Sequence, residues 1–141
     1  MRARGRRLGI DVGAVRVGVA LSDPDGVLAT PLATVPRDAP GGTDLVMISG
    51  MIAEHDVVGV VVGLPRTLAG REGPAAEAAR EFAAALAGRI TVPVEFADER
   101  LTTVVATRQM RESGRKGRRQ RAVVDQVAAV AILQGWLDAR R

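Results

Sequence analysis

The run Val57–Val62 constrains the fold more than any other part of the sequence, because it is almost uninterrupted in β-branched residues. Such a run is typical of a strand that is covered on both faces, as the central strands of parallel sheets are. We expect this strand to end at Gly63-Leu64-Pro65. A strand covered on both faces needs helices above and below it, so the run predicts an α/β fold.

The segments before this run predict three short strands and a helix. Residues 8–13, 16–21 and 27–35 are apolar and separated by glycines and turn residues, which predicts an antiparallel meander. Residues 43–54 follow a helical apolar period, and Thr43 is the expected N-terminal cap.

The second half of the chain predicts a strand at 92–97 and three helices. The helices are expected at 74–86, from Thr102 or Thr103 to 112, and at 122–139, with a basic loop at 113–121. We expect the apolar face of the last helix to carry Val123, Val127, Val130, Leu133 and Leu137. The order βββαβαβαα predicts a mixed five-stranded sheet, with three antiparallel strands followed by two parallel ones and helices on its faces.

Length and composition indicate one globular domain over residues 1–141. Hydrophobic residues make up 47% of the chain but aromatic residues only 2%, so Val, Leu, Ile and Ala must build the core. Residues 1–7 are rich in Arg and are expected to form a flexible basic arm on nucleic acid or a solubilising tail.

Several classes of protein and site are excluded. The chain has no cysteine, so a disulfide framework, a thiolate metal site and a cysteine nucleophile are all ruled out. Asp11 and Arg16 interrupt the first apolar stretch, which argues against a signal peptide, and no run of about 20 apolar residues predicts a membrane span. We therefore expect a cytoplasmic protein.

Asp11 is the first candidate site residue, because it lies in the middle of an apolar strand between Gly9 and Gly13. An ionised carboxylate in such a place costs several kcal/mol unless a cation or hydrogen bonds compensate it. The glycines, Gly13 in particular, would allow a ligand to approach the backbone. The alternative is a structural Asp11 that pairs with Arg16 or caps the turn that follows.

Asp98 and Glu99 form the second candidate, because they directly follow the last predicted strand. Ligand sites of parallel α/β units gather beyond the carboxyl ends of the strands. We expect Glu99 to be the ligand and Asp98, with Arg100, to support it. The alternative is that both acids are ordinary turn residues near the N-terminus of the next helix.

Asp125 is the third candidate. On a helix it shares one face with Ala128, Ala129 and Ile132, so that this face is expected to point inward. The alternative is an acid in the first turn that interacts with the helix dipole. Together, Asp11, Glu99 and Asp125 would supply the oxygen ligands that Mg²⁺ or Mn²⁺ requires, and two ions about 3.5–4 Å apart could clamp a phosphoryl displacement.

A run of basic residues at 108–121 leads directly to Asp125 and suggests a polyanionic partner. Nineteen of the twenty basic residues of the chain are Arg, which binds phosphate in bidentate fashion. A solvated charge run is the alternative, but the density of charge next to Asp125 favours steering of nucleic-acid phosphates. The residues expected to contact nucleic acid are Arg115, Lys116, Arg118, Arg119 and Arg121.

With these residues identified, the sequence resembles the bacterial YqgF (RuvX) family of pre-16S ribosomal RNA nucleases, also described as Holliday-junction-resolvase-like proteins. The resemblance rests on five motifs in order: Gly9-Ile10-Asp11-Val12-Gly13; Arg16-Val17-Gly18-Val19-Ala20 with Ser22-Asp23; Gly63-Leu64-Pro65 with Gly70; Asp98-Glu99-Arg100-Leu101-Thr102-Thr103; and Asp125 with Ala128-Ala129 and Ile132-Leu133.

The resemblance implies a ribonuclease-H-like fold and metal-dependent cleavage of phosphodiester bonds by an acidic site at Asp11, Glu99 and Asp125. One departure is that the family's loop before the last helix is usually rich in Lys, whereas this chain has Arg115-Lys116-Gly117-Arg118-Arg119. The resemblance leaves open whether the substrate is precursor ribosomal RNA or a four-way DNA junction, and whether the protein is a monomer or a homodimer.

Two other functions remain as alternatives. The Asp11-x-Gly13 pattern also resembles the phosphate loop of actin-like ATPases and sugar kinases, but those proteins close two such domains around a nucleotide and 141 residues supply only one. A non-catalytic RNA-binding factor for ribosome assembly would bind without metal and would tolerate the loss of Asp11.

Overall fold

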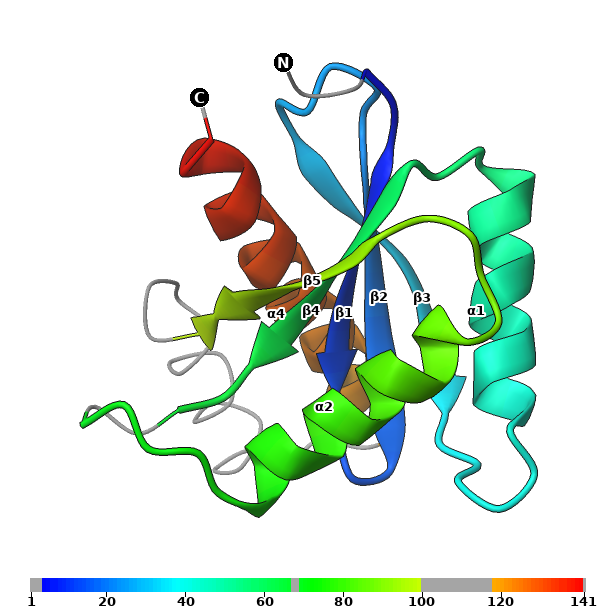
Figure 1. The fold of residues 1–141 in the computed structure, drawn as a ribbon, viewed down its shortest axis with the longest axis vertical. Coiled ribbons are helices and arrows are strands. Elements are labelled where there is room, and N and C mark those ends of the chain that lie inside the picture. Colours follow the sequence, from blue (N-terminus) through cyan, green and yellow to red (C-terminus); the bar gives the residue numbers. More distant parts are fainter. Residues whose placement is uncertain (1–3, 67–68, 100–117, 141) are drawn as a thin grey trace.

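The computed structural model describes residues 4–66, 69–99 and 118–140, apart from the side chains of residues 118–122. Its centre is a five-stranded sheet with the strand order β3-β2-β1-β4-β5, shown in Figure 1. The strands are β1 (Arg7–Val12), β2 (Arg16–Ser22), β3 (Ala29–Pro36), β4 (Gly59–Leu64) and β5 (Val94–Asp98). β1, β2 and β3 are antiparallel neighbours, whereas β4 pairs in parallel with β1 and with β5. The predicted mixed sheet is confirmed.

Helices cover both faces of this sheet. α1 (Thr43–Glu54) and α2 (Pro74–Ala87) pack on one face, and α4 (Arg118–Asp138) crosses the other, as Figure 1 shows. All six residues of β4 are buried, which confirms a strand covered on both sides. None of the helices in the described part of the chain combines the length and apolar character that crossing a bilayer requires.

Each face of the sheet has its own hydrophobic core. Alternate strand residues such as Leu8, Ile10 and Val62 pack under α1 and α2 with Ile48 and Leu86. In the core under α4, the residues contributed by the strands have small side chains and are mostly alanine. Its members are Ala20, Ala29, Val61, Ala97, Ala128, Ala129, Ile132, Leu133, Trp136 and Leu137.

Glycines in three neighbouring strands allow α4 to approach the sheet closely. A Cβ added to Gly9 of β1 would lie 2.6 Å from the Cβ of Leu133, and one added to Gly18 of β2 would run into the backbone carbonyl of Asp125. A Cβ on Gly63 of β4 would collide with the side chain of Ile132. The backbone of α4 therefore lies close to β1 and β2, and its Ile132 side chain lies close to β4, where a side chain in place of each glycine would collide.

The last helix differs from its prediction in two respects. α4 begins at Arg118, so residues 118–121 are helical rather than part of the predicted loop. Arg and Gln are good helix formers, and a basic composition does not by itself break a helix. The expected apolar face was also partly wrong, because Val123 and Val127 are 52% and 47% exposed. The buried face of α4 instead carries Ala128, Ala129, Ile132, Leu133, Trp136 and Leu137.

Other boundaries also differ. β4 starts two residues later than predicted and continues through Gly63 and Leu64, because these residues still pair in register with β5. β1 begins at Arg7, which had been assigned to the basic arm but is buried and lies 5.3 Å above the ring of Trp136. The helix predicted up to residue 112 and residues 113–117 of the predicted loop lie outside the described residues.

The start of α1 is fixed by Asp38 rather than by Thr43. The N-terminal cap of α1 is Gly42, at a φ of 73°, and makes no side-chain cap hydrogen bond. Thr43 is the first helical residue, and its Oγ1 donates to Oδ2 of Asp38 at 2.7 Å. The backbone N–H groups of Thr43 and Gly41 also donate to this carboxylate. These hydrogen bonds, led by that of the Thr43 hydroxyl, lower the pKa of Asp38 from its ordinary value of 3.8.

The contact at Gly18 predicts a large loss of stability on a small substitution. Gly18→Ala should lower the free energy of unfolding by about 2 kcal/mol or more, because the new methyl meets backbone that has no rotamer to relax into. Gly59→Ala in β4 is the matched control, since its Cβ would find only ordinary contacts at 3.8 Å and beyond. Chemical denaturation should show the control unchanged or slightly more stable. Equal stability of the two variants would contradict the close packing of α4.

The Asp38 contacts predict a pH dependence. Because the pKa of Asp38 is lower in the folded chain, its ionised form stabilises the fold at neutral pH, and this contribution is lost as the pH falls through the folded pKa. The unfolding free energies of wild type and Asp38→Asn should therefore differ at neutral pH and converge as the pH falls below 3.8 and through the lower folded pKa. The double variant Asp38→Asn/Thr43→Val should be only slightly less stable than Asp38→Asn alone, because Asp38→Asn already alters the acceptor of the Thr43 hydroxyl. A difference that does not change with pH would refute this role.

Candidate active site

Asp11 lies in β1 between two glycines. Leu8, Ile10 and Val12 of this strand face the core under α1 and α2, so the Asp11 side chain faces α4. Asp11 pairs with Gly18 of β2, and on the other side the Ile10–Val62 pair places Gly63 of β4 next to it. The residue is only 1% exposed. The Asp11 carboxylate is therefore flanked by a glycine on each neighbouring strand, Gly18 of β2 and Gly63 of β4, and neither carries a side chain.

Asp125 lies over the first of these glycines. It is on the buried face of α4 and is 2% exposed, which agrees with its predicted inward orientation. Its backbone carbonyl lies directly above Gly18, the cross-strand partner of Asp11. Arg16 at the start of β2 donates from Nε to Oδ2 of Asp125 at 2.8 Å. Arg16 thus forms its ion pair with Asp125. The alternative considered above had paired Arg16 with Asp11.

Glu99 lies over the second glycine. It follows β5 directly and is 2% exposed. Its Oε1 atom lies 3.1 Å from where a Cβ would stand on Gly63. The side chain therefore reaches from β5 across β4 toward Asp11. Gly18 and Gly63 leave the space on either side of Asp11 that Asp125 and Glu99 enter.

Asp98 has different surroundings from Glu99. It is the last residue of β5, and its Oδ2 lies 3.5 Å from Nη1 of Arg66. Arg66 also pairs with Glu72 at 3.4 Å, and Glu72 accepts two hydrogen bonds of 2.7 Å from Arg80. The Arg80 hydrogen bonds lower the pKa of Glu72 and raise that of Arg80. Asp98 thereby connects the end of β5 to the segment before α2.

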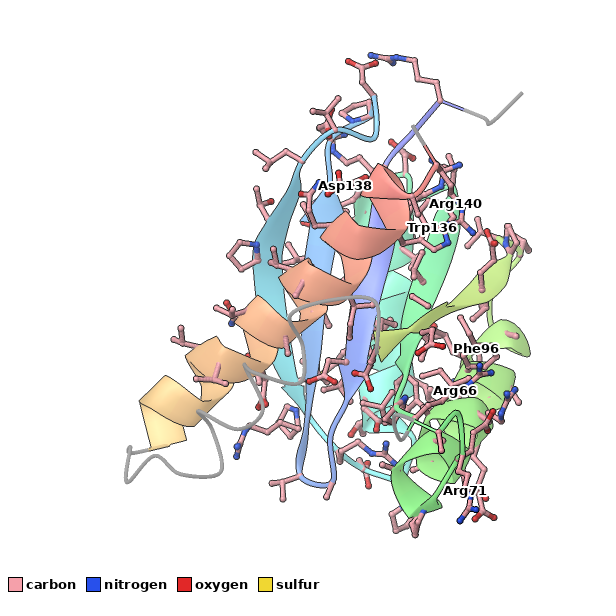
Figure 2. All side chains as sticks on the ribbon, turned by 90° about the vertical axis from the view of Figure 1, so that its left-hand side faces the viewer. Arg66, Arg71, Phe96, Trp136, Asp138 and Arg140 are labelled. Carbon is pink, nitrogen blue, oxygen red and sulfur yellow. The ribbon has the colours of Figure 1, made fainter. Side chains whose placement is uncertain are left out.

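Figure 2 shows this side of the molecule, with α4 lying across the strands and Arg66 and Phe96 beside β5. The Arg80 guanidinium lies 5.1 Å above the ring of Phe96. Glu72 and Arg80 belong to the segment before α2 and to α2 itself, and the contact of Arg80 with Phe96 joins this helix to β5. Sequence reasoning missed this chain of ion pairs, because nothing local shows that Arg66, Glu72 and Arg80 meet.

A pocket opens next to Asp125. It has a volume of about 260 Å³ and is lined by Gly13, Ala14, Val15, Arg16 and Asp125. Gly13 closes the β1–β2 hairpin by donating its N–H to the carbonyl of Arg16 at 2.9 Å. A Cβ on Gly13 would lie 2.5 Å from that carbonyl oxygen, so the hairpin requires glycine here. The supporting role predicted for Gly13 thus has a structural basis in the shape of the pocket wall.

Asp11, Glu99 and Asp125 supply the type of ligand atom that a divalent metal needs, but their carboxylates are not grouped around one point in this structure. Carboxylate oxygens are the ligands that Mg²⁺ and Mn²⁺ prefer. Within residues 4–66, 69–99 and 118–140, however, no three His, Asp or Glu side chains are close enough together to hold one ion. Arg16 engages Oδ2 of Asp125. Coordination by all three acids would therefore require side-chain movement.

Only part of the predicted basic surface falls within the described residues. Arg100, Arg115 and Lys116 lie outside them, and the side chains of Arg118, Arg119 and Arg121 are not described. The backbone of 118–121 forms the first turn of α4. Since a helix rises 1.5 Å per residue, this turn lies within about 10 Å of Asp125 along the helix axis.

Comparison with solved structures identifies the fold. The chain is similar to RuvC from Thermus thermophilus in complex with a Holliday junction substrate, with a TM-score of 0.60 and 16% identity over 96% of this chain and 95% of that one. A second structure of Thermus thermophilus RuvC gives a TM-score of 0.54, also at 16% identity and with the same coverage. RuvC has a ribonuclease-H-like fold, so the predicted fold class is confirmed.

Comparison with curated proteins gives much higher identity. A protein of Mycobacterium sp. (strain KMS) named "Putative pre-16S rRNA nuclease" is 61% identical over 139 residues, covering 98% of this chain and 82% of that protein. A protein of the same name from Rhodococcus jostii (strain RHA1) is 57% identical over 141 residues, covering 97% and 79%. The family described as "RuvX: Holliday junction resolvase" matches residues 5–139. With this match over almost the whole chain and relatives of this identity, the protein belongs to the RuvX family.

Proposed function

We propose that this protein is a metal-dependent endonuclease that hydrolyses phosphodiester bonds of structured nucleic acid, and that its substrate is the 5′ end of pre-16S ribosomal RNA. The name carried by the relatives at 57–61% identity supports the substrate. Family membership supports a hydrolase that acts on nucleic acid. Processing of ribosomal RNA would place the protein in the cytoplasm.

The observation that carries the proposal is the placement of three buried acids around one row of the sheet. Asp11 is in the row, while Asp125 and Glu99 lie above the glycines on its two sides. All three are at most 2% exposed. Burying three carboxylates on one side of the sheet is costly to the fold, and a bound cation would offset this cost alongside Arg16.

The proposed roles follow from how each acid is held. Asp11 is fixed by the backbone pairing of β1, so its carboxylate would provide the constant ligand. Asp125 and Glu99 reach the site from α4 and from the end of β5, and they would hold Mg²⁺ or Mn²⁺ together with Asp11. The bound ion would supply Lewis acidity at the scissile phosphate. Arg16 neutralises Asp125 and limits the repulsion between the acids before an ion binds.

Recognition of the substrate is proposed to depend on the basic residues near the start of α4. Arg115, Lys116, Arg118, Arg119 and Arg121 would bind backbone phosphates, with Arg100 and Asp98 supporting the turn at Glu99. Hydrolysis would then add water across one P–O bond, leaving a phosphate on one fragment and a hydroxyl on the other.

A four-way DNA junction is the second candidate substrate. The family description and the similarity in fold to RuvC favour it, because that neighbour was solved with a Holliday junction. Symmetric cleavage of a junction needs two active sites and hence a homodimer, whereas cleavage of RNA allows a monomer.

The proposed role of Asp11 predicts a loss of cleavage when its charge is removed. Asp11→Asn should lower cleavage of labelled pre-16S RNA at least about 100-fold, because it removes one charged ligand from the centre of the site. EDTA should abolish wild-type cleavage, and added Mg²⁺ or Mn²⁺ should restore it. A four-way DNA junction tested in parallel would identify the preferred substrate.

Asp44→Asn is the matched control for Asp11→Asn. Asp44 is also 2% exposed, but it lies at the start of α1 on the other face of the sheet and pairs with Arg37. It should cleave like the wild type once folding is verified by circular dichroism. Binding of RNA by the wild type without cleavage under any metal would instead favour a non-catalytic assembly factor.

A second prediction separates Glu99 from Asp98. Glu99→Gln should reduce the cleavage rate by about 100-fold, whereas Asp98→Asn should reduce it only several-fold, because Asp98 pairs with Arg66 at the other side of the strand end. Single-turnover cleavage at saturating metal would measure both. Loss of equal size in the two variants would assign both acids to the metal.

A further inference from the structure

The Arg16 side chain is held by an ion pair with Asp125 and is partly exposed to solvent. Its Nε donates to Asp125 at 2.8 Å, and the Asp125 side chain is 3% exposed. The Arg16 side chain is 20% exposed, so part of it is accessible to solvent, and it lines a pocket. Among the contacts of the described residues, Nε is the only side-chain donor that Arg16 uses. A guanidinium carries five N–H donors, so most of its binding capacity remains.

This pocket lies at the β1–β2 hairpin. The hairpin residues Gly13, Ala14 and Val15 line this pocket together with Arg16 and Asp125. At about 260 Å³ it is smaller than the pockets that hold drug-sized ligands, which measure about 300–1,000 Å³. It suits a small polar group attached to a larger molecule that remains outside.

From this geometry we propose that Arg16 and the hairpin form a phosphate subsite that holds one backbone phosphodiester of the nucleic acid beside the acids. The inference rests on the proposed function and deepens it, since it adds a substrate-contacting residue outside the basic residues 115–121. The planar fork of Arg matches two phosphate oxygens, and Asp125 fixes the orientation of the fork in advance.

The same ion pair makes the subsite dependent on Asp125. Arg16 and Asp125 compensate each other's charge. If Asp125 were to hold a divalent metal, the positive charge of Arg16 would be less fully matched and would attract an anion more strongly. Substrate phosphate and metal would therefore bind cooperatively through a single pair of side chains.

The test is nucleic-acid binding measured in EDTA over a range of salt concentrations, for the wild type and for Arg16→Gln. The probes are a labelled four-way DNA junction and a labelled RNA hairpin. Arg16→Gln should weaken binding about tenfold and lower the slope of log K against log salt by about one, because one phosphate contact is lost. Arg16→Lys should keep the slope but bind several-fold more weakly, because it retains the charge without the fork.

Arg89→Gln is the matched control, because it removes one positive charge on the α1 and α2 side of the sheet, where Arg89 lies near Gly42. It should leave the salt slope unchanged. If Arg16→Gln keeps the wild-type slope and loses only thermal stability or kcat, Arg16 is a support for Asp125 and the subsite is refuted. If the slope falls although the wild type cleaves neither probe when metal is added, the subsite stands and the proposed nuclease fails.

Discussion

The glycines of β2 and β4 determine how closely Asp125 and Glu99 can approach Asp11 at the candidate site. Gly18 allows the Asp125 turn of the helix to lie directly on β2, and Gly63 leaves the space that the Glu99 side chain enters. Larger side chains at these two positions would hold the helix and the acid away from Asp11. Packing of backbone against helix therefore comes first, and the electrostatics of the site follow from it.

This arrangement costs stability, because it concentrates negative charge where water is excluded. Asp11, Glu99 and Asp125 are buried on the same side of the sheet as the core under α4, whose strand residues are mostly alanine and bury less apolar surface than the Val and Leu residues under α1 and α2. The larger core on the other face is thus expected to carry most of the stability of the fold.

Much of this could be predicted from the sequence where a local pattern determines the answer. The valine run predicted a doubly covered strand, and the spacing from Asp125 to Ala128 and Ile132 predicted an inward face. Glu99 and Asp98 could not be separated, because their surroundings depend on Gly63 and Arg66, which are distant in sequence. Val123 and Val127 were misjudged because their hydrophobicity favours burial, whereas the buried face of α4 runs through Asp125, Ala129 and Ile132 and leaves both valines exposed.

The aromatic residues limit how the protein can recognise nucleic acid. Trp136, the only tryptophan, is 4% exposed and lies between the guanidinium groups of Arg7 and Arg140, at 5.3 and 3.8 Å from its ring. Phe82 is buried, and Arg80 covers Phe96. The chain has no tyrosine, and Phe96, beneath Arg80, is the partly exposed phenylalanine at 37%, so stacking on unpaired bases has little aromatic surface to use. Recognition of nucleic acid is therefore expected to depend mainly on where phosphates lie in space, so that shape would distinguish one substrate from another.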